Sequence, residues 1–142
     1  MQKTLIDAGP IIALFDRDDK YHEPVKAFLA DFKQPLISTW PVITEVTHML
    51  DFNVKVQIDF LEWISREAIQ LINLETNHIL RLIELTRKYA DVPMDLADGS
   101  LIVVSELTGI KNILTIDSDY YIYRTRKKQY LTNLLTPILT KY

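Results

Sequence analysis

Short apolar segments alternate with longer segments of helical periodicity along the chain, and this alternation restricts the fold more than any other feature. Residues 3–6, 35–38, 69–74 and 112–116 are predicted to be buried strands, and residues 131–135 a fifth strand at the sheet edge. Strands that alternate with helices favour right-handed crossovers and a parallel sheet covered on both faces. We therefore expect an α/β fold with its ligand site beyond the carboxyl ends of the strands.

Terminus signals and apolar stripes predict the helices between these strands. Pro24 and Pro41 suit the first turn of a helix, Thr76 and Asp95 suit the N-cap, and Gly109 is the residue type favoured just past a helix end. The stripes expected to face the core are Val25, Phe28, Leu29 and Phe32; Ile43, Val46 and Leu50; Ile58, Leu61, Ile64 and Ala68; Ile79, Leu82, Ile83 and Thr86; and Leu101 and Val104.

Acidic residues in four groups are expected to meet at the carboxyl edge of this sheet. Clustered carboxylates raise one another's pKa unless a cation lies among them. Mg²⁺ and Mn²⁺ prefer such oxygen ligands, and an ion held this way can activate water for phosphodiester hydrolysis. The acids are Asp7 after the first strand, Glu45 in the helix after the second, Asp95 and Asp98 at a helix N-terminus, and Asp117 and Asp119 after the fourth strand.

Each of these acids also has an interpretation that needs no metal. Asp95 and Asp98 suit an N-cap and a first-turn position, Asp117 can close an Asx turn, and Glu45 can be a solvated helix residue. Asp7 is harder to explain in this way, because an acid that ends a buried strand loses hydration unless something pairs with it. The coincidence of all four placements is therefore what favours a site.

The acids lie in four blocks, TLIDAGPIIAL (4–14), ITEV (43–46), PMDLADGSLI (93–102) and LTIDSDY (114–120). In this order they resemble the signature blocks of PIN-domain ribonucleases, and the subgroup is similar to the VapC-type toxins of bacterial toxin–antitoxin pairs. The resemblance implies a Rossmann-like three-layer α/β/α sandwich whose mainly parallel sheet has a strand order like 3-2-1-4-5. No repeat or linker interrupts the chain, so we expect residues 1–142 to form a single PIN-like domain.

The same resemblance implies a Mg²⁺- or Mn²⁺-dependent endoribonuclease, with RNA, a cognate antitoxin and a second copy of the chain as partners. By matching positions, Asp7, Glu45 and Asp98 would form the acidic core, with Asp117 or Asp119 as the fourth acid and Asp95 as a further metal ligand.

The chain departs from the family pattern at three places: Gly9, where many members carry Ser or Thr; Gly99, where Ala is usual; and Tyr120, where Phe is frequent.

A basic run follows the last acidic block, with Arg124, Arg126, Lys127 and Lys128 in five positions. Cations beside a metal-filled acidic pocket suit the phosphates of a polyanion, so these four residues are candidates for substrate binding. A solvated surface loop is the alternative. The formal net charge of −3 argues against a protein that holds nucleic acid by bulk charge alone.

Composition narrows the remaining possibilities. The chain has no Cys, which excludes disulfides and thiolate zinc sites. The start of the chain reaches Asp7 after only two apolar residues, so we expect no signal peptide. The apolar stretches are shorter than the roughly 18 residues of a membrane span, so we expect a cytoplasmic protein with no membrane contact.

Two other functions are considered. A phosphoryl-accepting receiver domain needs an adjacent acidic pair after the first strand, where Asp7 stands alone. A catalytically silent PIN-like module that binds RNA or a protein is the second alternative, and uptake of Mn²⁺ would distinguish it from the enzyme.

Overall fold

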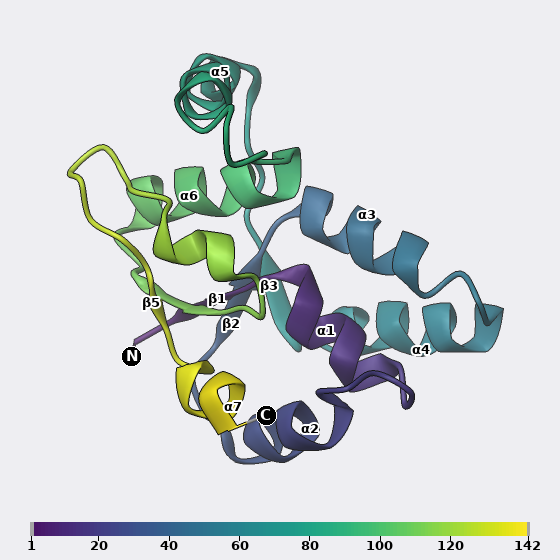
Figure 1. Cartoon of the computed structure of the whole chain (residues 1–142). Helices are drawn as coiled ribbons and strands as arrows, with labels where there is room; N and C mark the ends of the chain where they lie inside the picture. Colours follow the sequence, from purple (N-terminus) through teal and green to yellow (C-terminus); the bar gives the residue numbers. More distant parts are fainter. Residues whose placement is uncertain (1, 142) are drawn as a thin grey trace.

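Five parallel strands form one sheet at the centre of the computed structural model, which describes residues 2–141 (Figure 1). The order β3-β2-β1-β4-β5 is the predicted one. β2 and β3 are added on one side of β1, and the chain then crosses back so that β4 and β5 lie on the other side. The strand order therefore reverses between β1 and β4. The strands are β1 (Thr4–Ile6), β2 (Leu36–Ser38), β3 (Ile69–Leu71), β4 (Asn112–Leu114) and β5 (Thr132–Asn133).

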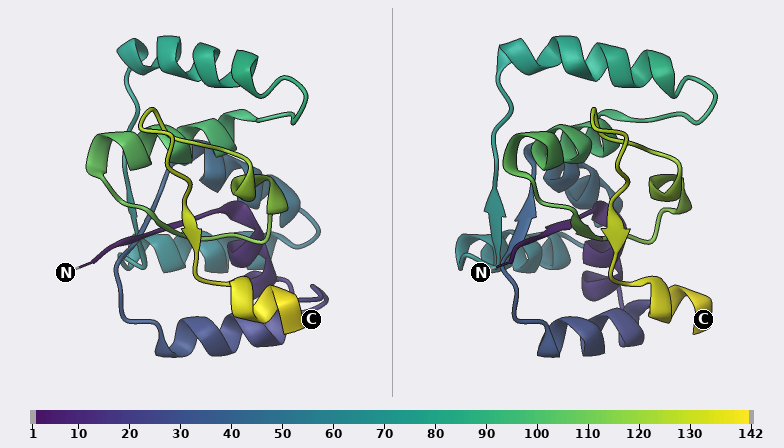
Figure 2. Two further views of the ribbon diagram at one scale, coloured as in Figure 1. Left: turned by 60° about the vertical axis from the view of Figure 1, so that its left-hand side comes forward. Right: turned by 90° about the vertical axis from the view of Figure 1, so that its left-hand side faces the viewer.

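Helices cover both faces of the sheet, which confirms the predicted three-layer arrangement. In Figures 1 and 2, α5 and α6 lie on one side of the strands, and α2 and α7 lie on the other. None of the described helices is long and apolar enough to cross a membrane. The helices are α1 (Ala8–Phe15), α2 (His22–Asp31), α3 (Trp40–Met49), α4 (Val54–Ser65), α5 (Ile79–Lys88), α6 (Leu96–Thr108) and α7 (Thr136–Lys141), with 3-10 turns η1 (Thr76–His78) and η2 (Ser118–Tyr121).

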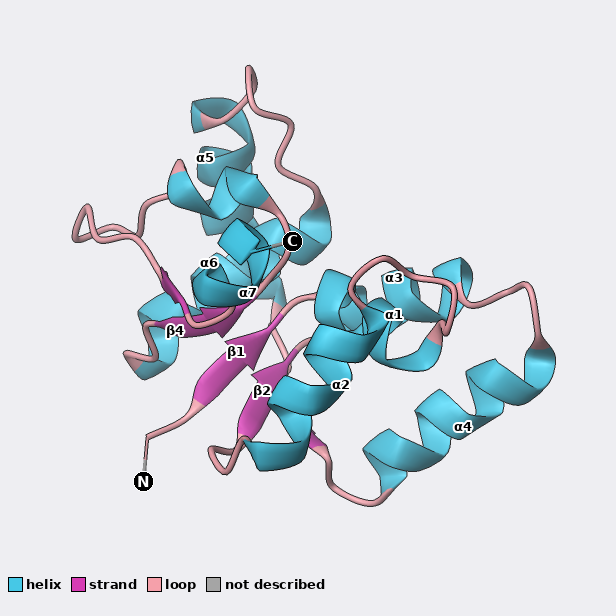
Figure 3. Ribbon diagram, turned by 60° about the horizontal axis from the view of Figure 1, so that its bottom comes forward, coloured by secondary structure: helices cyan, strands magenta, loops and turns pink. Residues whose placement is uncertain are grey.

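The central strands β1, β2 and β4 are almost wholly buried, as a covered parallel sheet requires, while the edge strands β3 and β5 each carry one exposed residue. Figure 3 shows β1, β2 and β4 side by side, and β1 has no residue open to solvent. Side chains that are fully buried around the sheet include Leu5, Ile6, Ile37, Ile113 and Leu114 from the strands and Ile11, Val46, Leu101 and Val104 from the helices.

Three strands end earlier than predicted. The strand expected over 112–116 stops at Leu114, because the backbone of Thr115 bonds to the side chain of Asn133 and not to the backbone of a neighbouring strand. The strand expected over 69–74 stops at Leu71, at the sheet edge, and the one expected over 131–135 is limited to two residues.

The buried face of α4 differs from the predicted stripe. Ile58 and Leu61 are 49% and 47% exposed, whereas Phe60 is fully buried. The ring of Phe15 meets the rings of Phe60 and Trp63 edge to face, at centroid distances of 5.6 and 5.4 Å. These large aromatic surfaces determine which side of α4 is buried, and the aliphatic spacing does not reveal them.

The start and the buried face of α5 also differ from expectation. Glu75 caps the 3-10 turn that precedes the helix, so the predicted N-cap at Thr76 is wrong. Leu82 is buried as predicted and Leu85 joins it, while Ile79 and Ile83 are exposed. A Cβ placed on Gly99 of α6 would lie 3.0 Å from Cδ2 of Leu82 in α5, so the two helices pack closely at this glycine.

Candidate metal centre

Three carboxylates from distant parts of the chain meet at the carboxyl edge of the sheet. Asp7 follows β1, Asp98 lies in the first turn of α6, and Asp117 precedes η2. One carboxylate oxygen of each lies within 4.8 Å of the others. We call Asp7, Asp98 and Asp117 the three-carboxylate cluster, and it lies where the sequence places the ends of adjacent strands.

Asp7 is the most deeply buried member of this cluster, with 5% of its surface exposed. Its Oδ2 accepts a hydrogen bond from the Thr115 hydroxyl at 3.0 Å, while its Oδ1 is buried without a hydrogen-bond partner. Burial raises the pKa of Asp7 to about 7, and repulsion from Glu45 and Asp117 adds to the effect. Asp7 thus has one buried carboxylate oxygen without a hydrogen-bond partner and lies beside two other carboxylates, so the residues fit a hard divalent ion.

Thr115 connects two members of the cluster. Its hydroxyl donates to Asp7 and accepts a hydrogen bond from the backbone N–H of Asp117 at 3.0 Å. The side chain of Asn133 in β5 in turn bonds the backbone of Thr115, donating to its carbonyl at 2.9 Å and accepting from its N–H at 3.2 Å. Sequence reasoning missed both residues, although a polar side chain at the end of a buried strand is a signal that could have indicated Thr115.

Asp98 receives hydrogen bonds from two tyrosines and one backbone N–H. The hydroxyls of Tyr120 and Tyr123 donate to its two oxygens, each at 3.3 Å, and the N–H of Asp95 donates to Oδ2 at 3.4 Å. Burial raises the pKa of Asp98 to about 8, and repulsion from Asp7, Asp95 and Asp117 contributes. Burial also raises the pKa of Asp117. A divalent cation would relieve this accumulation of buried negative charge.

The other predicted acids flank the cluster. Glu45 is half-buried in α3, and its pKa is raised by burial and then by the charges of Asp95 and Asp117. Asp95 caps α6 by accepting a bond from the Asp98 N–H at 2.8 Å, as its position predicts. The Asp119 N–H donates to Asp117 at 2.8 Å, so of the two candidates for a fourth acid it is Asp117 whose carboxylate joins the cluster.

A hollow of about 620 Å³ opens beside Glu45 and Asp95. Its lining also includes the exposed ring of Trp40 at the start of α3, together with His48 and Leu96. Glu45 and Asp95 therefore lie beside a surface that is partly apolar.

The structure does not bring Arg126 to the cluster. The Arg126 guanidinium lies 3.6 Å from the Glu84 carboxylate, and the backbone N–H of Arg126 donates to the Glu106 carboxylate at 2.8 Å. Glu106 follows Asp98 by eight residues in α6, which is about 12 Å along a helix axis. Figure 1 shows the segment after η2 passing the far end of α6 before it returns to β5.

The other three basic residues belong to the same segment. Arg124 donates to the carbonyls of Tyr121 and Tyr123, and its guanidinium lies 4.8 Å from the ring centre of Tyr130. Lys127 and Lys128 are exposed in a tight turn closed by a hydrogen bond from the Lys128 N–H to the Thr125 carbonyl.

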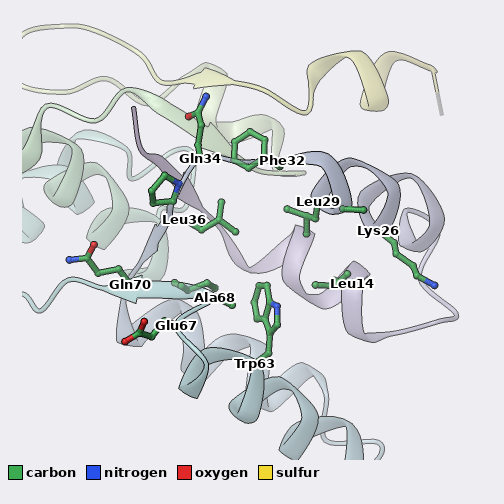
Figure 4. A pocket seen from close by; sticks show the side chains of 13 residues that line it. Leu14, Lys26, Leu29, Phe32, Gln34, Leu36, Trp63, Glu67, Ala68 and Gln70 are labelled. Carbon is green, nitrogen blue, oxygen red and sulfur yellow. The ribbon is translucent and has the colours of Figure 1, made fainter. Parts of the chain in front are cut away.

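A cavity of about 710 Å³ lies at the opposite edge of the sheet (Figure 4). Leu36 and Gln70 from β2 and β3 line it, with Leu29 and Trp63 from the helices. Because the strands are parallel, this cavity is at their amino ends and is separate from the carboxylates.

Comparisons with known proteins agree with this architecture. The sequence profile of the PIN domain matches residues 4–128, which confirms the predicted resemblance. The solved structure of the toxin VapC20 from Mycobacterium tuberculosis, described as cleaving the sarcin–ricin loop, superposes with a TM-score of 0.76 at 14% sequence identity. The match covers 84% of this chain and 94% of that one. No curated protein sequence matches the chain.

Proposed function

This chain belongs to the PIN domain family, and from that membership and its carboxylate geometry we propose a metal-dependent endoribonuclease that hydrolyses RNA phosphodiester bonds. We assign it to the toxin class of VapBC-type pairs, in line with its similarity to VapC20, a toxin described as cleaving the sarcin–ricin loop. The observation that carries the proposal is the buried, unpartnered Oδ1 of Asp7 within a cluster completed by Asp98 and Asp117.

Asp7, Asp98 and Asp117 would hold Mg²⁺ or Mn²⁺, with Asp95 and Asp119 as further candidate ligands beside them. When bound, such an ion lowers the pKa of water and stabilises negative charge on phosphoryl oxygens. Thr115 occupies one oxygen of Asp7 and leaves the other for the ion.

Glu45 is proposed as the general base, because it flanks the cluster and because burial and the charges of Asp95 and Asp117 raise its pKa above the ordinary value of a glutamate. It would accept a proton from the attacking water, at a position more open to solvent than Asp7.

The basic segment is proposed to bind the RNA backbone away from the cut. Arg124, Arg126, Lys127 and Lys128 would contact phosphates, which orient a nucleic acid without reading its sequence. The ion pair of Arg126 with Glu84 would have to be exchanged for a phosphate contact.

We also propose that the chain acts in the cytoplasm, as one domain over residues 1–142, and pairs with a second copy and with a cognate antitoxin. Exposed apolar side chains support a protein interface, because patches of this kind mark interaction sites. Trp40, Ile79 and Leu96 are exposed and line one hollow of about 390 Å³ between α3 and α5, with Ile83 one turn further along α5. An antitoxin segment would enter the acidic groove and block it.

The test is cleavage of RNA with Mg²⁺, repeated with chelator and with Asp7→Asn. Both should abolish cleavage, because each removes the ion or its deepest ligand. Asp31→Asn, which changes an exposed carboxylate at the end of α2, is the matched control and should cleave as the parent does. Full cleavage by Asp7→Asn would exclude this mechanism. A parent chain that binds RNA but neither cleaves it nor takes up Mn²⁺ would be a silent binding module.

A further inference from the structure

We infer that the hydroxyls of Tyr120 and Tyr123 are positioning groups that hold the carboxylate of Asp98 in its ligand orientation and thereby determine how tightly the site takes up a cation. This inference rests on the proposed function, because it concerns the same metal centre. It adds two aromatic residues to a site otherwise defined by acids.

The two hydroxyls reach different oxygens of one carboxylate. Tyr120 donates to Oδ1 of Asp98 and Tyr123 donates to Oδ2. Donors on both oxygens, each at 3.3 Å, restrict rotation of the carboxylate about its Cβ–Cγ bond more than a donor on one oxygen would. The Asp95 N–H adds a third bond to Oδ2.

Packing fixes the tyrosines themselves. Tyr120 and Tyr123 are buried, and their rings meet edge to face with centroids 5.3 Å apart. Tyr89, just after α5, packs edge to face on Tyr123 at 5.1 Å, and its hydroxyl accepts the backbone N–H of Arg124 at 2.7 Å. The rings of the two Asp98 donors are therefore packed against each other and against Tyr89, and the Tyr89–Arg124 hydrogen bond joins the segment after η2 to the end of α5.

Ring burial alone does not require these hydroxyls. A phenylalanine would fill nearly the same volume, and a buried hydroxyl without a partner costs free energy. Both hydroxyls find an acceptor in Asp98. Asp7 differs, since one of its oxygens has no donor. Asp98 is thus oriented by the protein, while Asp7 keeps an oxygen for the ion.

The experiment measures Mn²⁺ affinity by isothermal titration for the parent chain and for Tyr120→Phe, Tyr123→Phe and the double variant. Partners behind a metal ligand typically account for 10- to 100-fold in affinity, so we expect the double variant to bind Mn²⁺ at least about 10-fold more weakly and each single variant less so. Tyr121→Phe is the matched control, because Tyr121 is exposed and its hydroxyl contacts Thr136.

The melting temperature in chelator identifies which variants remain folded, and if the double variant unfolds, the single variants decide. Parent-like Mn²⁺ affinity in the folded Phe variants, or an equal loss in Tyr121→Phe, would overturn the inference and leave the proposed function intact. If the parent chain itself takes up no Mn²⁺, the proposed function fails instead.

Discussion

The carboxyl groups of Asp7 and Asp98 have pKa values raised to about 7 and about 8, chiefly by burial. A carboxyl whose pKa is higher in the folded than in the unfolded chain binds more protons when folded. Stability of the metal-free protein should therefore fall as pH rises from about 4 to about 8. Each unit of pKa difference corresponds to about 1.4 kcal/mol.

We thus expect the melting temperature in chelator to decrease from pH 5 to pH 9, and Asp98→Asn to reduce this slope. Thermal denaturation followed by circular dichroism at several pH values measures it. Asp31→Asn should keep the parent slope, and a stability that rises over this range would contradict the raised pKa values.

The Thr115 hydroxyl bonds both Asp7 and Asp117, two of the proposed metal ligands. Thr115→Val removes this hydroxyl at nearly constant side-chain volume. The change leaves the Asp117 N–H without its acceptor and Asp7 without its donor, which should cost about 1–3 kcal/mol of unfolding free energy. Thr115→Ser should restore most of the loss in urea denaturation. A serine variant as unstable as the valine variant would show that the hydroxyl alone does not restore the stability, which would contradict this role of Thr115.

At the scale of elements, Gly109 ends α6 in the left-handed region with φ of 78°. A Cβ there would meet no atom within 4 Å, so Gly109→Ala should cost about 1 kcal/mol from backbone strain alone. Glu67 follows α4 with φ of 65°, and Glu67→Gly should stabilise by a similar amount. Urea denaturation of the two variants should give opposite shifts, and equal signs would contradict this explanation.

Helix ends were more predictable than helix faces. Asp95 and Gly109 bound α6 as their residue types indicate, because capping depends on a few neighbouring backbone groups. The buried side of α4 depends on Phe15, about 45 residues earlier in the sequence, whose ring selects Phe60 and Trp63. Phe60 and Trp63 themselves stand at helical spacing, so the local pattern permits more than one buried face of α4, and the contact with Phe15 decides between them.

At the scale of the whole molecule, pairing of two copies through the surface around Trp40, Ile79 and Leu96 predicts a change in molecular mass. Ile79→Glu should convert dimers to monomers, because it places a charge in an apolar contact. An acid in the first turn of α5 is compatible with the helix dipole, so the fold should be preserved. Light scattering after size-exclusion chromatography measures the mass. Leu61→Glu, on the exposed side of α4, should remain dimeric, and an unchanged mass for Ile79→Glu would place any interface elsewhere.

The order of strands and helices along the chain and the placement of acids at strand and helix ends could be predicted from the residues alone. Periodicity and capping act between residues close in the chain, and the four ordered blocks carried the family resemblance. Which acids meet, how Tyr123 and Asn133 support them, and why Arg126 lies at the far end of α6 became visible only in the packed fold. Those contacts join residues tens of positions apart, and they form only when the sheet and its covering helices pack together.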